Sequence, residues 1–120
     1  MKFVKSLALI ATSFAMLLLS GCGESPEDVA QKYMTALIEG DLDTMNKVST
    51  AQTAQLNGFF IAAIENDPKK EEKKAKMKAD LKFDKTEIDG EYAKVYIEGN
   101  DNPMTLKKVD GEWKVDFKKN

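Results

Sequence analysis

The first 22 residues constrain this chain more than any other segment. Lys2 and Lys5 make the N-terminus basic, and residues 6–19 then run without a charge. A helix needs about 20 apolar residues to cross the hydrocarbon core of a bilayer, so this run is too short to span it comfortably. A basic start followed by a short apolar run is typical of a secretory signal peptide. We therefore expect residues 1–21 to be removed on export and to take no part in the folded domain.

The residues Leu19-Ser20-Gly21-Cys22 resemble a lipobox, the site at which lipoprotein precursors are cleaved and lipidated. Small side chains at Ser20 and Gly21 let an extended chain enter a peptidase groove, and the thiol of Cys22 is the nucleophile that takes a diacylglyceryl group. We expect cleavage between Gly21 and Cys22. Cys22 is the only cysteine of the chain, which excludes an intramolecular disulfide. The alternatives are an ordinary signal peptide with a chance cysteine and an uncleaved membrane anchor.

A lipid on Cys22 would fix the location of the domain. One acyl chain gives only marginal membrane binding, but a mature lipoprotein carries two or three. Resemblance to enterobacterial lipoproteins implies that Gly23, a residue other than Asp, permits sorting to the outer membrane, facing the periplasm. Residues 22–24 are too short to act as a tether, so residues 25–120 should form one domain close to the membrane surface.

The composition of the mature chain argues against several functions. Removing Lys2 and Lys5 from 18 basic residues leaves 16, against 20 Asp and Glu, so the net charge is −4. The chain has no Arg, which binds phosphate in a bidentate manner, so we expect no nucleic-acid partner. It also has no His, the commonest general base and metal ligand. Since no catalytic motif or calcium-loop pattern is found, we expect no enzymatic activity, cofactor or metal.

Apolar periodicity predicts three helices between residues 25 and 66. Ser25 is a good N-cap before Pro26, and Gly40 ends the first helix. A short second helix should run from Asp41 through Val48, with Leu42 and Met45 inward. The third should run from Ala51 to Asn66. Its expected buried face consists of apolar residues at helical spacing: Leu56, Phe59, Phe60, Ala63 and Ile64.

The segment Lys69–Lys78 carries six Lys and two Glu. The spacing of Glu72 and Lys76 gives some support for a further helix, with a change to strand near Ala79. This run is either a solvated surface or a contact for anionic lipid headgroups near the anchor.

The rest of the chain predicts four antiparallel strands. Turn signals at Asp89-Gly90, residues 99–102 and Asp110-Gly111 separate four alternating segments. The residues expected on the core face are Leu81, Phe83, Ala93, Val95, Ile97, Met104, Leu106, Trp113, Val115 and Phe117. The charged face of the sheet includes Lys94, Lys114 and Asp116. A sheet with one apolar face needs a cover, so we predict an α+β fold in which the three N-terminal helices pack on a four-stranded antiparallel meander.

This order of elements resembles the small exported domains of the nuclear transport factor two-like superfamily, a cone of curved sheet over helices. It is most similar to bacterial lipoproteins of unknown function described as lumazine-binding-like or cystatin-like. Four segments carry the resemblance: Pro26–Leu37, Gly40–Asp43, Thr86–Val95 and Val109–Asp116. No catalytic motif of the superfamily matches, and four strands would make a narrow cone. The fold itself hosts isomerases, dehydratases, adaptors and plain binding domains, so it does not fix a function.

Two further sets of side chains are candidate sites. Tyr33, Phe59, Phe60 and Trp113 either line an apolar pocket for a small ligand or simply pack in the core. Tyr92, Lys94 and Tyr96 either meet an envelope protein partner or form a solvated outer face. The expected function is that of a membrane-anchored, non-enzymatic accessory or binding domain. The alternatives are a small-molecule-binding or enzymatic cone and a structural or envelope-stress lipoprotein.

Overall fold

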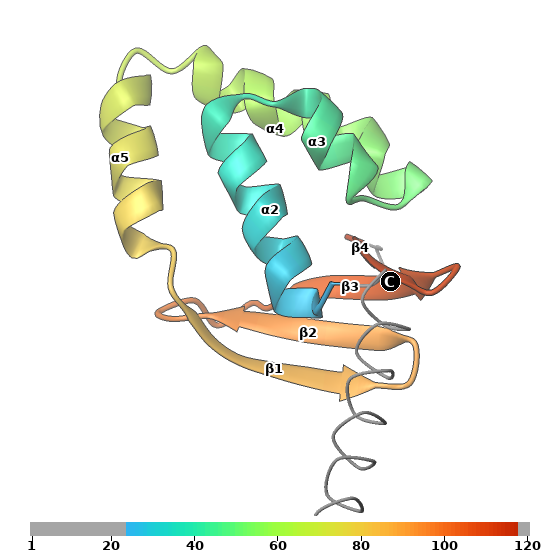
Figure 1. Cartoon of the computed structure of the whole chain (residues 1–120). Coiled ribbons are helices and arrows are strands. Elements are labelled where there is room, and N and C mark those ends of the chain that lie inside the picture. The colour runs from blue at the N-terminus through green and yellow to red at the C-terminus, as the bar shows by residue number, and fades with distance from the viewer. Residues whose placement is uncertain (1–23, 118–120) are drawn as a thin grey trace, which may run out of the picture.

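The computed structural model describes residues 24–117, so the predicted signal peptide, the cleavage site at Gly21 and the lipidation site at Cys22 lie outside the described residues. Helices precede strands along this part of the chain (Figure 1). Their bounds are α2 Pro26–Glu39, α3 Leu42–Lys47, α4 Ala51–Glu65, α5 Lys70–Asp80, β1 Phe83–Asp89, β2 Tyr92–Ile97, β3 Met104–Val109 and β4 Glu112–Val115. The predicted α+β class is therefore confirmed. The number of helices is corrected from three to four within residues 24–117, because the lysine-rich segment is helical.

Short polar side chains set the starts of the first three of these helices. The Ser25 hydroxyl accepts the N–H of Asp28 at 3.1 Å, and Asp41 and Thr50 cap α3 and α4 in the same way. Gly40 ends α2 with φ of 74°, and a Cβ there would lie 3.3 Å from Oε2 of Glu65. The cap at Ser25 and the stop at Gly40 that were predicted from the sequence are confirmed.

The sheet is a meander with the strand order β1-β2-β3-β4, antiparallel throughout. Ala93 of β2 pairs with Leu106 of β3, which pairs with Val115 of β4, and all three side chains are buried. Ser49, between α3 and α4, forms a parallel bridge with Val115 and so closes the β4 edge. One predicted detail is wrong: Asp116 is buried instead of exposed on the charged face, because Thr50 packs on it and donates to Oδ1 at 2.9 Å.

Helix α2 is the main cover of the sheet. It contacts β1, β2 and β4, and it also contacts the other three helices. In Figure 1, α2 rises from the sheet while α3 and α4 lie across its far end. The central core therefore forms between α2 and the sheet. Its buried members are Val29, Ala30, Tyr33, Ala36, Met45, Ala93, Val95, Met104, Leu106, Trp113 and Val115.

The predicted buried face of α4 is mostly wrong. Of its five residues, Ile64 is buried and Phe60 is half-buried, while Leu56, Phe59 and Ala63 are exposed. The residues that α4 buries most deeply are two polar ones, Thr53 and Asn57. On α3, Leu42 is likewise 40% exposed instead of inward.

Hydrogen bonds explain this rotation of α4. Buried polar groups need partners, and Asn57 has three: its Oδ1 accepts the Tyr33 hydroxyl at 2.7 Å, and its Nδ2 donates to Ser49 Oγ at 3.1 Å and to Asn46 Oδ1 at 3.0 Å. The Phe117 N–H donates to the Thr53 hydroxyl at 2.8 Å. Burial raises the pKa of Tyr33, so its hydroxyl remains a donor across the ordinary pH range. These bonds turn Thr53 and Asn57 inward and leave Phe59 outside.

Replacing Asn57 with Ala should lower the free energy of unfolding by about 1–3 kcal/mol, because the Tyr33 hydroxyl would be left buried without an acceptor. Urea unfolding followed by circular dichroism would measure the change. Asn46→Ala is the matched control, since Asn46 is exposed and its side-chain oxygen accepts a hydrogen bond from the amide of Asn57. An Asn57→Ala loss no larger than that of the control would contradict the role given to this bond.

Candidate interaction surfaces

The structure does not gather the four residues predicted to line an apolar pocket. Tyr33 is buried and lies edge-on to Phe117, with ring centroids 5.6 Å apart, and Phe60 meets the same ring at 6.1 Å. Trp113 is a buried core residue of β4, with the Lys108 ammonium 5.4 Å from its ring centroid. Phe59 is 77% exposed and points away from the core. Tyr33 and Phe60 thus both pack against the Phe117 ring, whereas Phe59 does not belong to this aromatic cluster.

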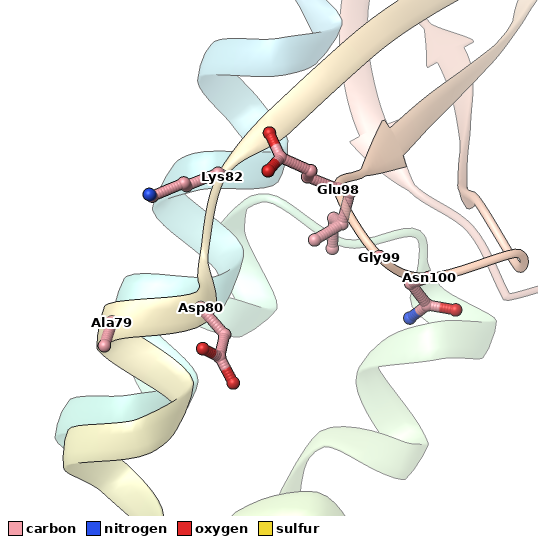
Figure 2. A pocket seen from close by; sticks show the side chains of 7 residues that line it. Ala79, Asp80, Lys82, Glu98, Gly99 and Asn100 are labelled. Carbon is pink, nitrogen blue, oxygen red and sulfur yellow. The ribbon is translucent and has the colours of Figure 1, made fainter.

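A hollow of about 490 Å³ lies between the end of α5 and the turn after β2, and it opens to solvent. Its lining includes Asp80, Lys82, Glu98 and Asn100. Figure 2 shows that the polar ends of these side chains do not converge, since those of Lys82 and Asp80 point in different directions. A ligand site needs a few convergent polar groups, so this hollow has little to fix a small molecule.

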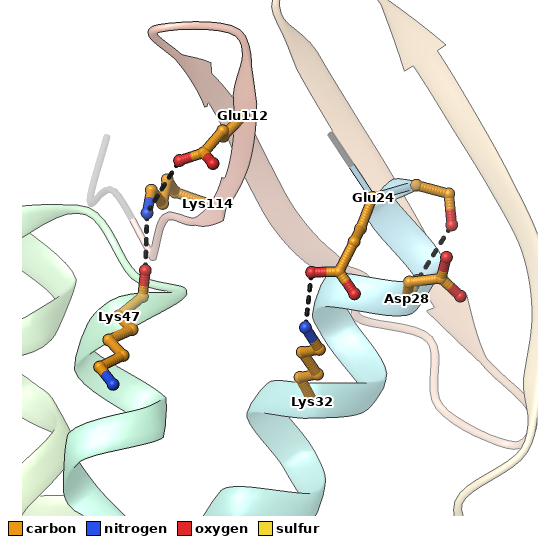
Figure 3. A network of polar contacts seen from close by, with 7 residues as sticks. Glu24, Asp28, Lys32, Lys47, Glu112 and Lys114 are labelled. Carbon is orange, nitrogen blue, oxygen red and sulfur yellow. Dashed lines mark hydrogen bonds and ion pairs between the residues drawn. The ribbon is translucent and has the colours of Figure 1, made fainter. Parts of the chain in front are cut away.

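A smaller hollow, of about 110 Å³, lies at the N-terminal end of α2 and is lined in part by Trp113. The charges around it are used within the chain (Figure 3). The Lys114 ammonium donates to the carbonyl of Lys47 at 2.6 Å, and Lys32 pairs with Glu24 at 2.6 Å. These contacts fix the first described residues of the chain against α2 and leave no obvious group for a ligand.

The face of the sheet that points away from the helices carries tyrosines between lysines. We call it the outer sheet surface: Lys85, Glu87, Asp89, Tyr92, Lys94, Tyr96, Lys107 and Lys114, of which Glu87 and Asp89 lie opposite Lys94 and Tyr92. Tyr92 is 51% exposed, and the Lys107 ammonium lies 6.0 Å from the centroid of its ring. The Lys85 ammonium lies 4.9 Å from the Tyr96 ring, whose hydroxyl donates to Glu87 at 3.1 Å. The tyrosine rings are therefore held in place by neighbours, as exposed aromatic contact residues often are.

Two lysines stand directly opposite each other on this surface. Lys107 of β3 pairs with Lys114 of β4, although like charges across a strand pair are unfavourable. Beside them is an open hollow of about 320 Å³, which also includes the start of α4 at Thr50–Gln52. The row Tyr92, Lys107 and Lys114 thus joins an exposed aromatic ring to a recess, and Lys107 is its available cation, since the Lys114 ammonium is bonded to the Lys47 carbonyl and lies 3.6 Å from Glu112.

The outward side of α4 forms a second surface, and three of its residues, Leu56, Phe59 and Ala63, were predicted from the sequence to be buried. We call it the α4 surface: Leu56, Phe59, Ala62 and Ala63, all exposed. No residue of α4 before Glu65 carries a charge. The sequence signal that identifies it is the pair Thr53 and Asn57, spaced i, i+4 in an otherwise apolar helix. Two polar residues at this spacing lie on the same side of a helix, and they turn that side inward when other elements supply hydrogen-bond partners for them. The apolar side chains on the opposite side of the helix then face solvent.

The lysines of Lys69–Lys78 mostly have partners within the chain. Lys74 pairs with Glu65 at 2.6 Å, Lys70 approaches the same carboxylate at 3.5 Å, and Lys73 pairs with Asp67 at 2.6 Å. A hydrogen bond from Lys74 holds the pKa of Glu65 below its usual value, and Lys73 does the same for the pKa of Asp67. Because α5 buries no residue, these pairs are its principal attachment to α4.

Within residues 24–117, no group of three or more His, Cys, Asp or Glu side chains is arranged to hold a metal ion. No helix in the same range is long and apolar enough to cross a membrane. Comparisons of the chain with protein-family models, curated proteins and solved structures give no match. The surfaces described above are therefore the basis for a functional proposal.

Acid should weaken the attachment of α5. Because the pKa of Glu65 is lowered from 4.5 by Lys74, the pair stabilises the fold fully above pH 4.5, and the contribution is lost as the pH falls through the lowered pKa. Both partners are partly exposed, so the effect is small and salt-sensitive. At neutral pH, Glu65→Gln should lower the hydrogen-exchange protection of α5 relative to α2. Glu71→Gln is the control, and equal α5 protection in both variants would contradict this reading.

Proposed function

We propose that this chain is a bacterial lipoprotein whose mature part is a non-enzymatic accessory or binding domain of the cell envelope, anchored through lipid on Cys22. The sequence support is the basic start, the short uncharged run and the segment Leu19–Cys22. Gly23 favours the outer membrane, with the domain facing the periplasm. The order of helices before a four-stranded meander agrees with a small member of the nuclear transport factor two-like superfamily, which is the fold family we propose.

A binding role is favoured over catalysis by how the domain uses its polar groups. The buried hydroxyl of Tyr33 and the amide of Asn57 bond to each other and to neighbouring side chains. The space between α2 and the sheet is filled by side chains that are almost fully buried, among them Val29, Leu106 and Val115. A catalytic group needs access to a substrate and a perturbed environment. The one buried hydroxyl with a strongly raised pKa, that of Tyr33, is enclosed in the core.

The observation that carries the proposal is the outer sheet surface. Tyr92 is half-exposed between Lys94 and Lys107, on the face of the sheet opposite to the buried side chains of Ala93 and Val95. Tyrosine is enriched where proteins bind each other, because its ring gives contact area at low entropy cost and its hydroxyl stays hydrated. Lys94 and Lys107, beside the Tyr92 ring, suit carboxylates of a partner, whereas Lys85 and Lys114 already approach Glu87 and Glu112 at 3.5 Å and 3.6 Å. The partner we propose is an envelope protein that presents acidic side chains to this surface.

The anchor itself is tested by replacing Cys22 with Ser. The variant should keep its signal peptide uncleaved by the lipoprotein peptidase or appear as an unlipidated periplasmic protein, and its mass should lack the acyl chains. Mass spectrometry and membrane fractionation measure both properties. Unchanged membrane retention together with an unchanged lipid mass would overturn the lipoprotein assignment.

The binding surface is tested by site-specific photo-crosslinking in cells. A photoreactive phenylalanine at Tyr92 should give one prominent adduct with an envelope protein, and Lys107→Glu should reduce that adduct by about tenfold or more if the charge contact contributes about 1.4 kcal/mol. Position 71, exposed on α5, is the matched control site. No adduct at position 92, or the same adducts at positions 92 and 71, would count against the outer sheet surface.

A further inference from the structure

Asn57 is the only asparagine of this chain that is followed by glycine. Asparagine loses ammonia when the backbone nitrogen of the next residue attacks its side-chain carbonyl carbon. Glycine in the next position favours this attack most, because it has no Cβ in the way and its backbone is the most flexible. Among the asparagines of the chain, Asn57 is therefore the one at which this reaction is chemically easiest.

The folded domain withholds both groups that the reaction needs. In helix α4 the N–H of Gly58 is directed at the carbonyl one turn earlier, and ring closure requires a backbone rotation at Asn57 that an α-helix does not allow. The side-chain amide is fixed by three hydrogen bonds, from Tyr33 and to Ser49 and Asn46. Asn57 is also fully buried, so the water that completes the reaction has no access to it.

The product of the reaction would not fit where Asn57 lies. Replacing the amide by a carboxylate removes both N–H donors and leaves a group that only accepts hydrogen bonds. The Ser49 hydroxyl cannot donate to this carboxylate, because it already donates to the carbonyl of Met45 at 2.6 Å. The carboxylate would face the oxygens of Ser49 and Asn46, with the Tyr33 hydroxyl as its remaining described donor. A buried charge with so few partners is strongly unfavourable.

We propose that Asn57-Gly58 is a modification site that reacts in the unfolded chain and not in the folded one, so that prolonged unfolding becomes irreversible. The Gly58 nitrogen bonds to Cγ of Asn57, the bond from Cγ to Nδ2 breaks, and ammonia leaves with the proton of the Gly58 N–H. Water then opens the cyclic imide at either of its carbonyls, which gives aspartate or isoaspartate at position 57. Isoaspartate adds a methylene to the main chain, which the regular geometry of α4 cannot accept.

The fold does not require a glycine at position 58. Gly58 is exposed in the middle of α4, and a Cβ added to it would meet open space. Glycine is also a poor residue for a helix interior compared with alanine. Gly58→Ala is therefore a matched variant, because it should fold at least as stably, keeps every hydrogen bond of Asn57 and hinders the attack by the neighbouring nitrogen.

The test holds the purified protein for equal times in native buffer and in urea, both at mildly alkaline pH and prepared with water enriched in heavy oxygen. Peptide mass mapping measures the conversion of Asn57 and the heavy oxygen that the water leaves there. Conversion should be faster in urea by about a thousandfold or more, because only about 10⁻³ or less of a folded domain is open at any time. After dilution of the urea, the fluorescence of Trp113, the only tryptophan, should return in proportion to the unconverted fraction.

Two variants complete the test. Gly58→Ala should convert severalfold more slowly in urea and keep its refolding yield. Asn57→Asp, which is one of the two products made directly, should unfold at a lower urea midpoint than the parent or fail to fold.

Four results would each overturn the inference. They are no conversion of Asn57 in urea, equal rates in urea and in native buffer, equal losses of refolding in Gly58→Ala and the parent, and an Asn57→Asp protein with the urea midpoint of the parent. None of these measurements depends on a lipid at Cys22 or on a partner at the outer sheet surface, so their failure would leave the proposed function untouched.

Discussion

The hydrogen bond between the Tyr33 hydroxyl and Asn57 is the contact on which the arrangement of the helices depends. It joins the middle of α2 to the middle of α4, and the Asn57 amide extends it to Ser49, whose hydroxyl in turn donates to the carbonyl of Met45 at 2.6 Å. A buried amide left without partners is costly, so α4 can pack on α2 in one rotation only. That rotation decides which side of α4 meets water, and thereby creates the α4 surface.

The sheet is held by a different kind of interaction. Its inner face is apolar and fits α2 through small residues, with Ala30 and Ala36 on the helix and Ala93 on β2 fully or almost fully buried. Small side chains allow helix and sheet to approach closely. The apolar core thus fixes α2 on the sheet, and the hydrogen bonds of Asn57 fix α3 and α4 on α2. The two candidate surfaces arise at opposite ends of this arrangement, on the outer faces of β2–β4 and of α4.

Much of the fold could be predicted from local signals. The caps at Ser25 and Asp41, the stop at Gly40 and the turns at Asp89-Gly90 and Asp110-Gly111 are set by backbone chemistry within a few residues. The two faces of β2 could also be predicted, because Ala93 and Val95 alternate with Tyr92 and Lys94 along the strand. The rotation of α4 could not be predicted, because the partners of Asn57 come from Tyr33 and Ser49, which lie 24 and 8 residues away. Apolar periodicity gave the wrong side, and the α4 surface was missed with it. Tyr92, Lys94 and Tyr96 of the outer sheet surface were predicted from the sequence to share one face, but the opposed pair Lys107 and Lys114 depended on the strand register.

Helix α5 has a consequence for how the folded chain can be cut. It buries no residue, and ion pairs join its lysines to Glu65 and Asp67, so it should open locally more easily than α2, which is buried on the sheet. Its lysines make it a substrate for proteases that cut after basic residues, and a cut there needs only local opening. Such a cut would divide the chain into an N-terminal helical fragment, which keeps Cys22, and a C-terminal fragment, which keeps the whole sheet. The two fragments would then be held together only by noncovalent packing, chiefly that of α2 on the strands.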